Sequence, residues 1–310
     1  MKPLTDSVAL ILTPPPFPAV LFVEPANACN FRCGVCPESL PDYKSKAGYL
    51  QRMDPEVWEA VFQSICDAAP GGSDPMRPVD TIRFWGMGEP LLNPALPTMI
   101  HDVRHLARRT ELATNGTLLN YYAEALIDSH LSYLRVSIYG GTEDYSQQVG
   151  RNYSAKQVLD AVKFFRDART ARGSKTPFLT AHLMAPESDI PEFKATYEGI
   201  ADHLSIDVHH NWGGSESRLV SISNEPAKQD LCPKPFRELY VKSNGDVSVC
   251  CLDWDGKLIV GNVLKQSLQE IWEGPLVSGI RSKHEQGRKG DLVACRDCNF
   301  RTRDAKGNLI

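Results

Sequence analysis

Short strand-like runs alternate with helical patterns between Val20 and Trp212, and this alternation constrains the fold more than any other feature. Six runs rich in β-branched and aromatic residues predict strands: "VLFVEP", "DTIRFWG", "TELATNG", "LRVSIYG", "FLTAHLM" and "SIDVHHN". Five segments between them have the apolar spacing of amphipathic helices: "PEVWEAVFQSICDA", "PALPTMIHDVRHLA", "NYYAEALIDS", "AKQVLDAVKFFRDARTA" and "DIPEFKATYEGIADH". The alternation predicts βαβ units around a parallel sheet, and therefore an α/β fold.

The number of strand–helix units limits the architectures that the chain can adopt. Six strand–helix units are too few for a closed eight-stranded barrel, and the family resemblance carried by the cysteine loop described below implies a partial (β/α)6 barrel of the TIM type. Several of the strands end in Gly, Pro or Asn, residue types typical of loops. The functional residues of such folds lie in the loops at the carboxyl ends of the strands.

The pattern changes at the polar stretch Gly213–Gln229. After it, Asn244 and Gly245 join two alternating runs, which predicts a β-hairpin, and "SLQEIWEGPLVSGIRSKH" predicts a helix. We therefore expect an N-terminal extension (1–18), a partial-barrel core (19–222) and a small α+β domain (225–310).

Composition limits the partners. The net charge is −4, which gives no reason to expect nucleic acid as a partner. The longest apolar run, near Val8–Leu12, is too short to span a bilayer, and the first ten residues lack the pattern of a signal peptide. We expect a cytoplasmic protein that contacts neither membrane nor nucleic acid.

The nine cysteines fall into two groups. In a reducing compartment, clustered cysteines are more often metal ligands than disulfides. Cys29, Cys33 and Cys36 form a C-x3-C-x2-C loop just after the first predicted strand. Three thiolates can hold three corners of a cubic iron–sulfur cluster and leave one iron open. A zinc ion completed by His101 or His182 is the alternative.

This loop, followed by "GMGEP" after the second predicted strand, resembles the radical S-adenosylmethionine (SAM) superfamily across Val20–Trp212. The resemblance implies that the open iron chelates the amino and carboxylate groups of SAM. It also implies that an electron, supplied by a flavodoxin- or ferredoxin-type donor, cleaves SAM to a 5′-deoxyadenosyl radical, which abstracts hydrogen from the substrate.

The same resemblance implies residue roles around SAM. Phe31, inside the cysteine loop, would pack near the adenine. The "GMGEP" motif would hold the methionyl amine, with Glu89 as an acceptor, and it departs from the commoner GGEP form at Met87. The motif residues assigned to cofactor binding are Gly86, Met87, Gly88 and Glu89.

Three further positions follow later strands. By resemblance, Asn115 in "ATNG" and Ser137 in "VSIYGG" would contact the ribose and carboxylate of SAM. Arg151 in "GRN" would place a cation near the SAM carboxylate. Asn115 and Ser137 could equally be turn or cap residues.

The C-terminal cysteines are sufficient to close a second metal site. Their pattern, C-x12-G-x4-C followed by C-x2-C, resembles the twitch form of the SPASM domain, which carries an auxiliary [4Fe–4S] cluster. Structural zinc held by the same residues is the alternative. The expected ligands are Cys232, Cys250, Cys295 and Cys298.

Two cysteines remain. Cys251 follows a ligand on the predicted hairpin, so its side chain should point to the opposite face. Such a thiol either fills the core or donates a hydrogen atom to a substrate radical. Cys66 lies in an amphipathic helical pattern, and we expect it in the core.

Enzymes with such auxiliary domains modify peptides, or oxidise or epimerise aminocyclitols and aminoglycoside sugars. About twenty residues precede the first strand, which disfavours a peptide-recognition domain there. The polar residues expected around the barrel mouth are Glu24, Glu187, Asp189, Asp207, His209, His210, Asn211, Asp253 and Asp255. The acidic ones would suit a cationic aminosugar, although solvated loop carboxylates are the commoner explanation.

Cys251 beside a cluster ligand favours an epimerase (isomerase) of antibiotic biosynthesis that acts on an aminoglycoside, with this thiol as the catalytic hydrogen donor. The alternative is dehydrogenation of a secondary alcohol to a ketone. A peptide maturase, a sulfur-inserting enzyme and a non-catalytic zinc module rank lower.

Overall fold

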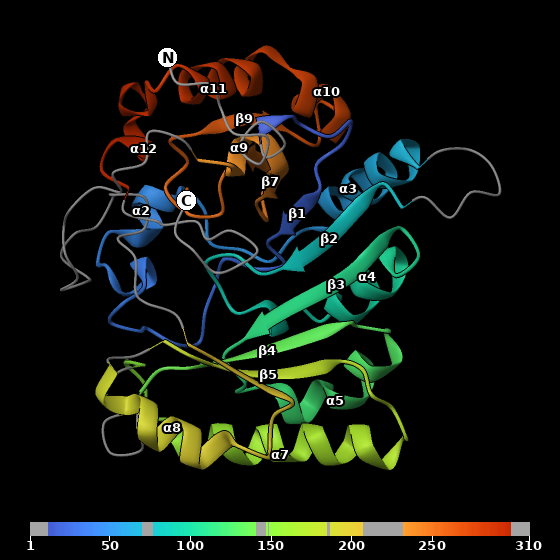
Figure 1. The fold of residues 1–310 in the computed structure, drawn as a ribbon, viewed down its shortest axis with the longest axis vertical. Helices are drawn as coiled ribbons and strands as arrows, with labels where there is room; N and C mark the ends of the chain where they lie inside the picture. Colours follow the sequence, from blue (N-terminus) through green and yellow to red (C-terminus); the bar gives the residue numbers. More distant parts are fainter. Residues whose placement is uncertain are drawn as a thin grey trace.

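The structure, a computed structural model, describes residues 12–69, 77–140, 147, 149–184, 187–206 and 232–298. A single sheet of nine strands runs through them, in the order β6-β5-β4-β3-β2-β1-β7-β8-β9 (Figure 1). The strands are β1 Val20–Val23, β2 Val79–Phe84, β3 Ala107–Thr114, β4 Tyr133–Ile138, β5 Phe178–Leu183, β6 His203–Ile206, β7 Glu238–Val241, β8 Asp246–Ser248 and β9 Ile259–Asn262.

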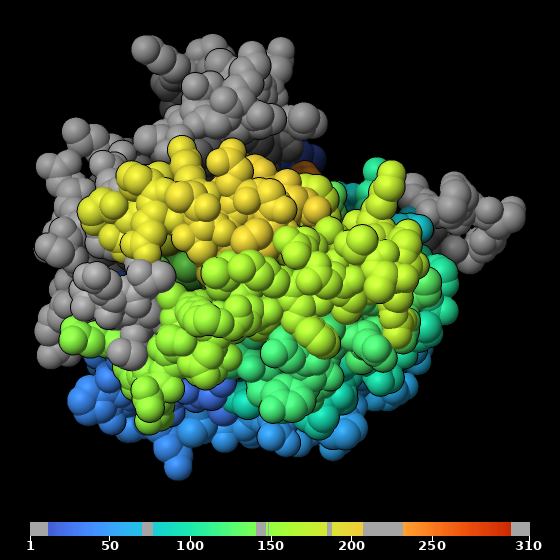
Figure 2. Space-filling view, turned by 90° about the horizontal axis from the view of Figure 1, so that it is seen from below, coloured from blue at the N-terminus to red at the C-terminus, as the bar shows by residue number. Residues whose placement is uncertain are grey.

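β1 to β6 are parallel, as the strand–helix alternation predicts, and all six predicted strands are confirmed in the described residues. The α/β partial-barrel class is therefore correct. The five predicted helices between them are also present: α3 Pro55–Ala68, α4 Leu96–Val103, α5 Leu119–Asp128, α7 Ala155–Ala171 and α8 Ile190–Tyr197. The face of the molecule in Figure 2 is covered by the green and yellow segments that contain α5, α7 and α8.

Local sequence explains two of the sharpest helix boundaries. α3 begins at Pro55, whose fixed φ suits the first helical position, after Asp54. α7 begins with a capping box in which Ser154 and Gln157 satisfy each other's backbone amides. Both helices match their predicted ranges to the residue, because these start signals are local.

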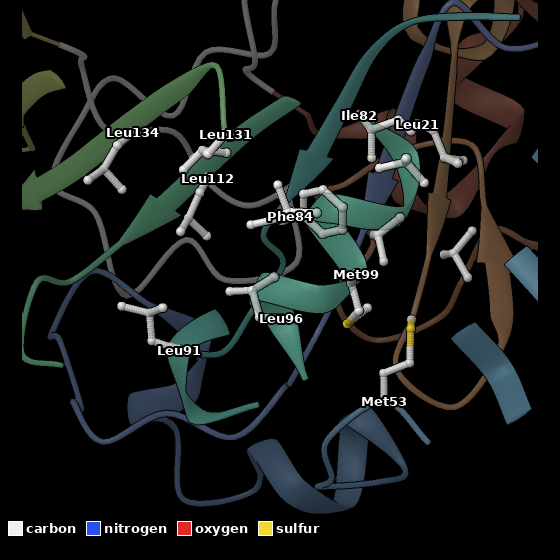
Figure 3. Close-up of a cluster of buried hydrophobic side chains, with 14 of the residues drawn as sticks. Leu21, Met53, Ile82, Phe84, Leu91, Leu96, Met99, Leu112, Leu131 and Leu134 are labelled. Carbon is white, nitrogen blue, oxygen red and sulfur yellow. The ribbon is translucent and has the colours of Figure 1, made fainter. Parts of the chain in front are cut away.

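The main core lies between the sheet and the helices. In Figure 3 the side chains of Ile82 and Phe84 on β2, Leu112 on β3, and Leu96 and Met99 on α4 gather in one layer. Each is at most 2% exposed. Full burial of such a side chain contributes about 1.5–3 kcal/mol, so this layer fixes the sheet against its helices.

The other face of the sheet has a different character. Because side chains alternate along a strand, the residues between the core positions point away from the helices. On β2 and its end these are Arg83 and Trp85, and on β3 and β4 they are Glu111 and Arg135. The barrel interior is therefore lined by polar and aromatic side chains rather than by aliphatic ones.

The C-terminal region continues the same sheet. β7 pairs with β1 in parallel, with Val20 opposite Glu238, and β8 returns antiparallel to β7. The predicted hairpin is confirmed, and Gly245 takes a positive φ of 87° in its turn. The connector Gly213–Gln229 and both boundaries between core and C-terminal domain lie outside the described residues.

The single helix expected over 267–284 is wrong. Two helices occur instead, separated at Gly274, whose ψ of 161° is extended. Pro275 follows, and a residue before proline is biased away from helical backbone. The C-terminal helices are α9 Lys234–Arg237, α10 Leu268–Glu273, α11 Pro275–Glu285 and α12 Val293–Arg296.

Short elements connect the loops at the strand ends. These are η1 Pro37–Ser39, α2 Tyr43–Ala47, η2 Pro90–Leu92, η3 Glu187–Asp189 and η6 Lys289–Asp291. In Figure 1, α2 lies on the side toward which the arrowheads of the parallel strands point. Among the described residues, no helix is both long and apolar enough to cross a membrane.

Candidate active site

The three-cysteine loop follows β1 and is held rigidly. Arg32 donates hydrogen bonds to the carbonyls of Cys29 and Phe31 at 2.8 and 2.6 Å, and it also pairs with buried Glu38. The amide of Cys36 donates to the carbonyl of Cys33 at 2.9 Å. The loop is therefore held in place by hydrogen bonds of its own.

The thiols of this loop lie within electrostatic reach of one another. Burial raises the pKa of Cys29, Cys33 and Cys36, that of Cys36 to about 12, and neighbouring thiols raise those of Cys29 and Cys33 further. Thiols with raised pKa become thiolates when a metal supplies positive charge. The three thiols of the loop are therefore suited to act as thiolate ligands of a metal cluster.

The glycines of "GMGEP" are required by close packing. A Cβ on Gly88 would stand 2.4 Å from the carbonyl oxygen of Ala28, and one on Gly86 would stand 2.5 Å from Oε1 of Glu24. The amide of Glu89 donates to the same Ala28 carbonyl at 3.0 Å. The motif therefore lies directly against the cysteine loop.

Glu89 joins the ends of two strands. Its Oε1 accepts from the amide of Leu91 at 3.0 Å and from the hydroxyl of Thr114 at 2.7 Å, and its Oε2 accepts from the amide of Asn115 at 2.8 Å. Burial raises the pKa of Glu89 to about 7, and these hydrogen bonds oppose that rise. The carboxylate also lies near enough to Cys29 to raise the pKa of that thiol.

Asn115 extends the site toward the first cysteine. Its Nδ2 donates to Oδ1 of Asn30 at 2.8 Å and lies 4.0 Å from Sγ of Cys29. Thr117 completes the group, because it accepts from Asn30 and donates to Oδ1 of Asn115, both at 2.7 Å. This closed set of hydrogen bonds explains why the end of β3 carries Asn-Gly-Thr.

The other expected SAM contacts are differently placed. Phe31 is buried against Tyr153, with ring centroids 5.6 Å apart. Ser137 is buried on β4. Arg151 is exposed but lies near enough to Glu38 to lower its pKa, which burial raises to about 7. The preceding Val149 accepts a hydrogen bond from the amide of Arg32 at 2.8 Å, so this segment packs on the cysteine loop.

The four C-terminal cysteines lie near enough to one another for their charges to interact. Charge on Cys298 raises the pKa of Cys232 and Cys295, and charge on Cys232 raises that of Cys250 and Cys295. Burial is the larger cause, and it contributes to a pKa of about 11 for Cys232 and about 12 for Cys295. The amide of Cys298 donates to the carbonyl of Cys295 at 3.4 Å.

In the part of the chain that the structure describes, no three His, Cys, Asp or Glu side chains converge on one ion position. In a cubic cluster each thiolate binds a different iron, so such a cluster does not require its ligands to meet at one ion position. The two histidines considered as zinc ligands have other neighbours: the rings of His101 and His130 are tilted, with centroids 6.2 Å apart, and Nδ1 of His182 bonds Ser205 at 2.7 Å.

Cys251 lies on the barrel side of the hairpin. Strand β8 ends at Ser248, so both cysteines lie beyond the strand. Cys250 precedes a turn, and Cys251 lies in it. Sγ of Cys251 is 3.9 Å from Nζ of Lys234, and Arg83 of the barrel interior is near enough to lower its pKa. Burial is the larger influence and raises that pKa, so the free thiol is protonated.

The barrel interior holds a connected set of charged and aromatic groups. The guanidinium carbons of Arg83 and Arg135 stand 5.4 and 4.8 Å from the ring centroid of Trp85. Nε of Arg83 donates to Glu111 at 2.8 Å. Burial and the charge of Arg135 lower the pKa of His182 to about 3, so this imidazole is neutral.

Two of the acidic residues expected around the barrel mouth, Glu24 and Asp253, are instead buried in hydrogen-bond networks. Glu24 is completely buried and accepts five hydrogen bonds. Asp253 accepts from Ser248 and two backbone amides, and Asp255 pairs with Lys257 at 2.6 Å. Asp189 lies half-buried in η3. Asp207, His209, His210, Asn211 and the side chain of Glu187 lie outside the described residues.

Cys66 corrects a further expectation. It is half-buried rather than part of the core, because the buried face of α3 is formed by its neighbours. These buried residues are Val57, Trp58, Val61, Ser64 and Ile65.

Sequence reasoning also missed the interior residues Arg83, Trp85 and Arg135, although their alternation with core positions on β2 and β4 was a usable signal.

Comparison with known proteins agrees with this geometry. Residues 23–195 match the model of the radical SAM superfamily, and residues 232–299 match an iron–sulfur cluster-binding domain, SPASM. The chain is 23% identical over 293 residues to an S-adenosyl-L-methionine-dependent 2-deoxy-scyllo-inosamine dehydrogenase of Niallia circulans, covering 91% of this chain and 92% of that protein. It is 26% identical to a PqqA peptide cyclase of Gluconobacter oxydans, covering 96% and 87%.

A solved structure shares the fold. The crystal structure of BtrN in complex with AdoMet and 2-DOIA superposes with a TM-score of 0.61 at 20% identity, covering 94% of this chain and 98% of that one.

Proposed function

This chain belongs to the radical SAM superfamily, and from that premise we propose that it is a dehydrogenase that oxidises a secondary alcohol of a small aminocyclitol-like substrate to a ketone. The observation that carries the proposal is end-to-end similarity to a dehydrogenase of 2-deoxy-scyllo-inosamine, which includes the C-terminal cysteine domain. This reaction is the alternative to epimerisation, and the relatives named above include no epimerase.

The two matched domains imply SAM and [4Fe–4S] clusters as cofactors, with an auxiliary cluster in the C-terminal domain. When bound, they supply a 5′-deoxyadenosyl radical that abstracts hydrogen and an acceptor for the substrate's remaining electron. We assign the first cluster to Cys29, Cys33 and Cys36, and the auxiliary cluster to Cys232, Cys250, Cys295 and Cys298. A flavodoxin- or ferredoxin-type protein is the proposed electron donor.

The residues at the strand ends would orient SAM. Glu89 is fixed by Leu91, Thr114 and Asn115, so a methionyl ammonium would meet a carboxylate that needs no rearrangement. Asn115 and Ser137 end neighbouring strands, where they would reach the ribose and carboxylate, and Arg151 would supply a cation. Phe31 would support the adenine only through the loop, because its ring is buried against Tyr153.

The barrel interior would bind the substrate. Trp85 offers a flat apolar surface suited to the C–H face of a ring, and Arg135 beside it can donate hydrogen bonds to hydroxyl oxygens. His182 is neutral, so it adds a hydrogen-bonding group without a charge. We therefore expect recognition of a ring with several hydroxyl groups.

Anaerobic turnover in deuterium oxide tests the reaction. With 2-deoxy-scyllo-inosamine and related cyclitols, dehydrogenation yields 5′-deoxyadenosine and a ketone two mass units lighter than the substrate. The carbon skeleton takes up no solvent deuterium at the reacting carbon. A product with unchanged composition and one carbon-bound solvent deuterium would contradict the proposal.

One observation supports epimerisation as the second candidate. The protonated thiol of Cys251 stands on the barrel side, beside Lys234 and within reach of Arg83. A thiol there can give its hydrogen atom to a carbon radical, provided that one electron and one proton later restore it. In that case Cys251→Ala abolishes epimer formation but retains SAM cleavage, whereas a dehydrogenase would still form ketone.

A further inference from the structure

Met87 is the residue that distinguishes "GMGEP" from the commoner motif, and its side chain does not face the barrel. It is 5% exposed and forms a small apolar cluster with Tyr43 and Trp254. The rings of Tyr43 and Trp254 are stacked, with centroids 5.5 Å apart and planes inclined by 24°. Half-buried Cys36 of the first cysteine group packs against the same cluster.

Each member of this cluster comes from a different part of the chain. Tyr43 begins α2, just after the three-cysteine loop, and Met87 follows β2. Trp254 lies three residues after Cys251, in the C-terminal domain. Its carbonyl accepts a hydrogen bond from buried Lys242 at 3.1 Å, so its position is fixed by the hairpin.

The backbone of Met87 is held by a second, independent contact. Its amide donates to Oε1 of Glu24 at 3.0 Å, and Glu24 is 0% exposed. The same carboxylate accepts from the hydroxyl of Tyr240, and from the amide and hydroxyl of Ser243 at 3.1 and 3.2 Å. Tyr49, after α2, also donates to it at 2.9 Å.

Both contacts lead to the C-terminal domain. The side chain of Met87 rests on Trp254, and its amide is fixed by a carboxylate that Tyr240 and Ser243 orient. The backbone at Gly86 packs closely against the C-terminal domain as well, because a Cβ there would stand 2.6 Å from the hydroxyl oxygen of Tyr240. The path of the motif at Gly86 and Met87 is therefore set by residues more than 150 positions later in the chain.

We propose that Met87 and Glu24 are positioning residues that couple SAM binding to the docking of the auxiliary-cluster domain. The inference rests on the assignment of Gly86–Glu89 to the methionyl group of SAM. When the hairpin and Trp254 are seated, the motif is held in its binding shape, and SAM binds tightly. Because coupling between two equilibria is reciprocal, bound SAM must stabilise the seated hairpin equally.

A purely structural contact would behave differently. Loss of packing alone lowers stability without changing the affinity of the molecules that remain folded. The decisive measurement is therefore the dissociation constant of SAM for cluster-loaded, folded enzyme, in the absence of substrate. The full-length variants are Met87→Ala, Trp254→Leu and their combination, with Met99→Ala as control, because Met99 is an equally buried methionine on α4.

Equilibrium dialysis with labelled SAM should show about 5–20-fold weaker binding for Met87→Ala and for Trp254→Leu, within the range typical of coupling between sites. The double variant should lose little more than either single variant. Met99→Ala should bind SAM as the wild type does, despite a lower Tm. Iron content and the spectrum of the reduced clusters before SAM addition should stay unchanged.

Glu24→Gln supplies a second route, because the amide keeps the size of the side chain but cannot accept all five hydrogen bonds. It should weaken SAM binding and reduce the change that SAM causes in the electron paramagnetic resonance spectrum. Wild-type affinity in Met87→Ala, or multiplicative losses in the double variant, would overturn the coupling. The readout does not involve product identity, so an epimer product would refute the proposed dehydrogenase and leave this inference standing.

Discussion

The carboxylate of Glu89 accepts a hydrogen bond from the backbone amide of Asn115 at 2.8 Å, which ties the motif after β2 to the end of β3. Both residues are buried, and Asn115 in turn reaches Cys29. Glu89 and Asn115, two of the proposed SAM-binding residues, therefore form one connected unit with the first cysteine group.

Substitution of Glu89 by Gln should disrupt this unit. The amide nitrogen brings a donor to a place where Leu91, Thr114 and Asn115 already donate. A buried unsatisfied donor costs about 1–3 kcal/mol. We expect SAM affinity to fall at least about 10-fold, measured by equilibrium dialysis. Gln63→Glu, on the exposed side of α3, is a control for a change of one charge, and equal effects of the two substitutions would contradict the assignment.

Single cysteine substitutions should separate the two clusters. The wild type should carry about eight irons, as two four-iron clusters require. Cys33→Ala and Cys298→Ala should each lose about half of this iron, because each removes a ligand of one group only. Cys66→Ala should retain all of it. Anaerobic reconstitution followed by iron analysis provides the measurement, and full iron in Cys298→Ala would exclude that residue as a ligand.

Two glycines should respond oppositely to alanine. In Gly88→Ala the new methyl group would collide with the carbonyls of Ala26 and Ala28, 2.5 and 2.4 Å away, so the loop must move. In Gly279→Ala, within α11, nothing lies within 4 Å of the new Cβ. We expect Gly88→Ala to lower Tm and iron content, and Gly279→Ala to stabilise by about 0.5–1 kcal/mol. Thermal unfolding of both variants tests the contrast.

His284 on α11 should make stability depend on pH. The residue is 1% exposed, neither ring nitrogen has a hydrogen-bond partner among the residues that the structure describes, and burial with the charge of Lys289 lowers its pKa to about 4. Above the unfolded pKa of about 6.5 the ring is neutral in both states, and the penalty is absent. As pH falls, the unfolded chain gains the proton first, so stability decreases down to about pH 4.

The size of this effect can be isolated by substitution. The preferential protonation of His284 in the unfolded chain should lower the free energy of unfolding by about 2 kcal/mol at pH 5 relative to pH 7.5. His284→Leu should therefore lose less stability than the wild type over this interval, when unfolding is followed anaerobically at both pH values. His101→Leu, on an exposed part of α4, is the matched control. Parallel losses in wild type and His284→Leu would contradict the prediction.

Local signals in the sequence were enough to predict the core elements. α3 and α7 could be bounded because Pro55 and Ser154 mark their starts. The parallel strands followed from the alternation alone, and the cysteine spacings indicated both metal sites. These signals depend on residues close together in the chain.

Features that depend on distant residues could not be predicted in the same way. The pairing of β1 with β7 joins segments more than 200 residues apart, and no periodicity encodes it. Glu24 looked like a substrate-facing acid because its partners Tyr240 and Ser243 are equally remote. The break between α10 and α11 at Gly274 is different, because it depends on local sequence. The Gly-Pro pair signals a helix boundary, but the apolar spacing on both sides of it favoured one continuous helix.

The position of β1 has a consequence for dissection of the enzyme. β1 is hydrogen-bonded to β2 on one side and to β7 on the other, so the C-terminal region covers a strand edge of the barrel. A truncated chain ending before β7 would expose the backbone amides and carbonyls of Val20 and Phe22, and the amide of Glu24 that donates to Val241, together with their apolar neighbours. Such an open edge recruits further chains, and the isolated barrel should aggregate rather than act as a slower enzyme.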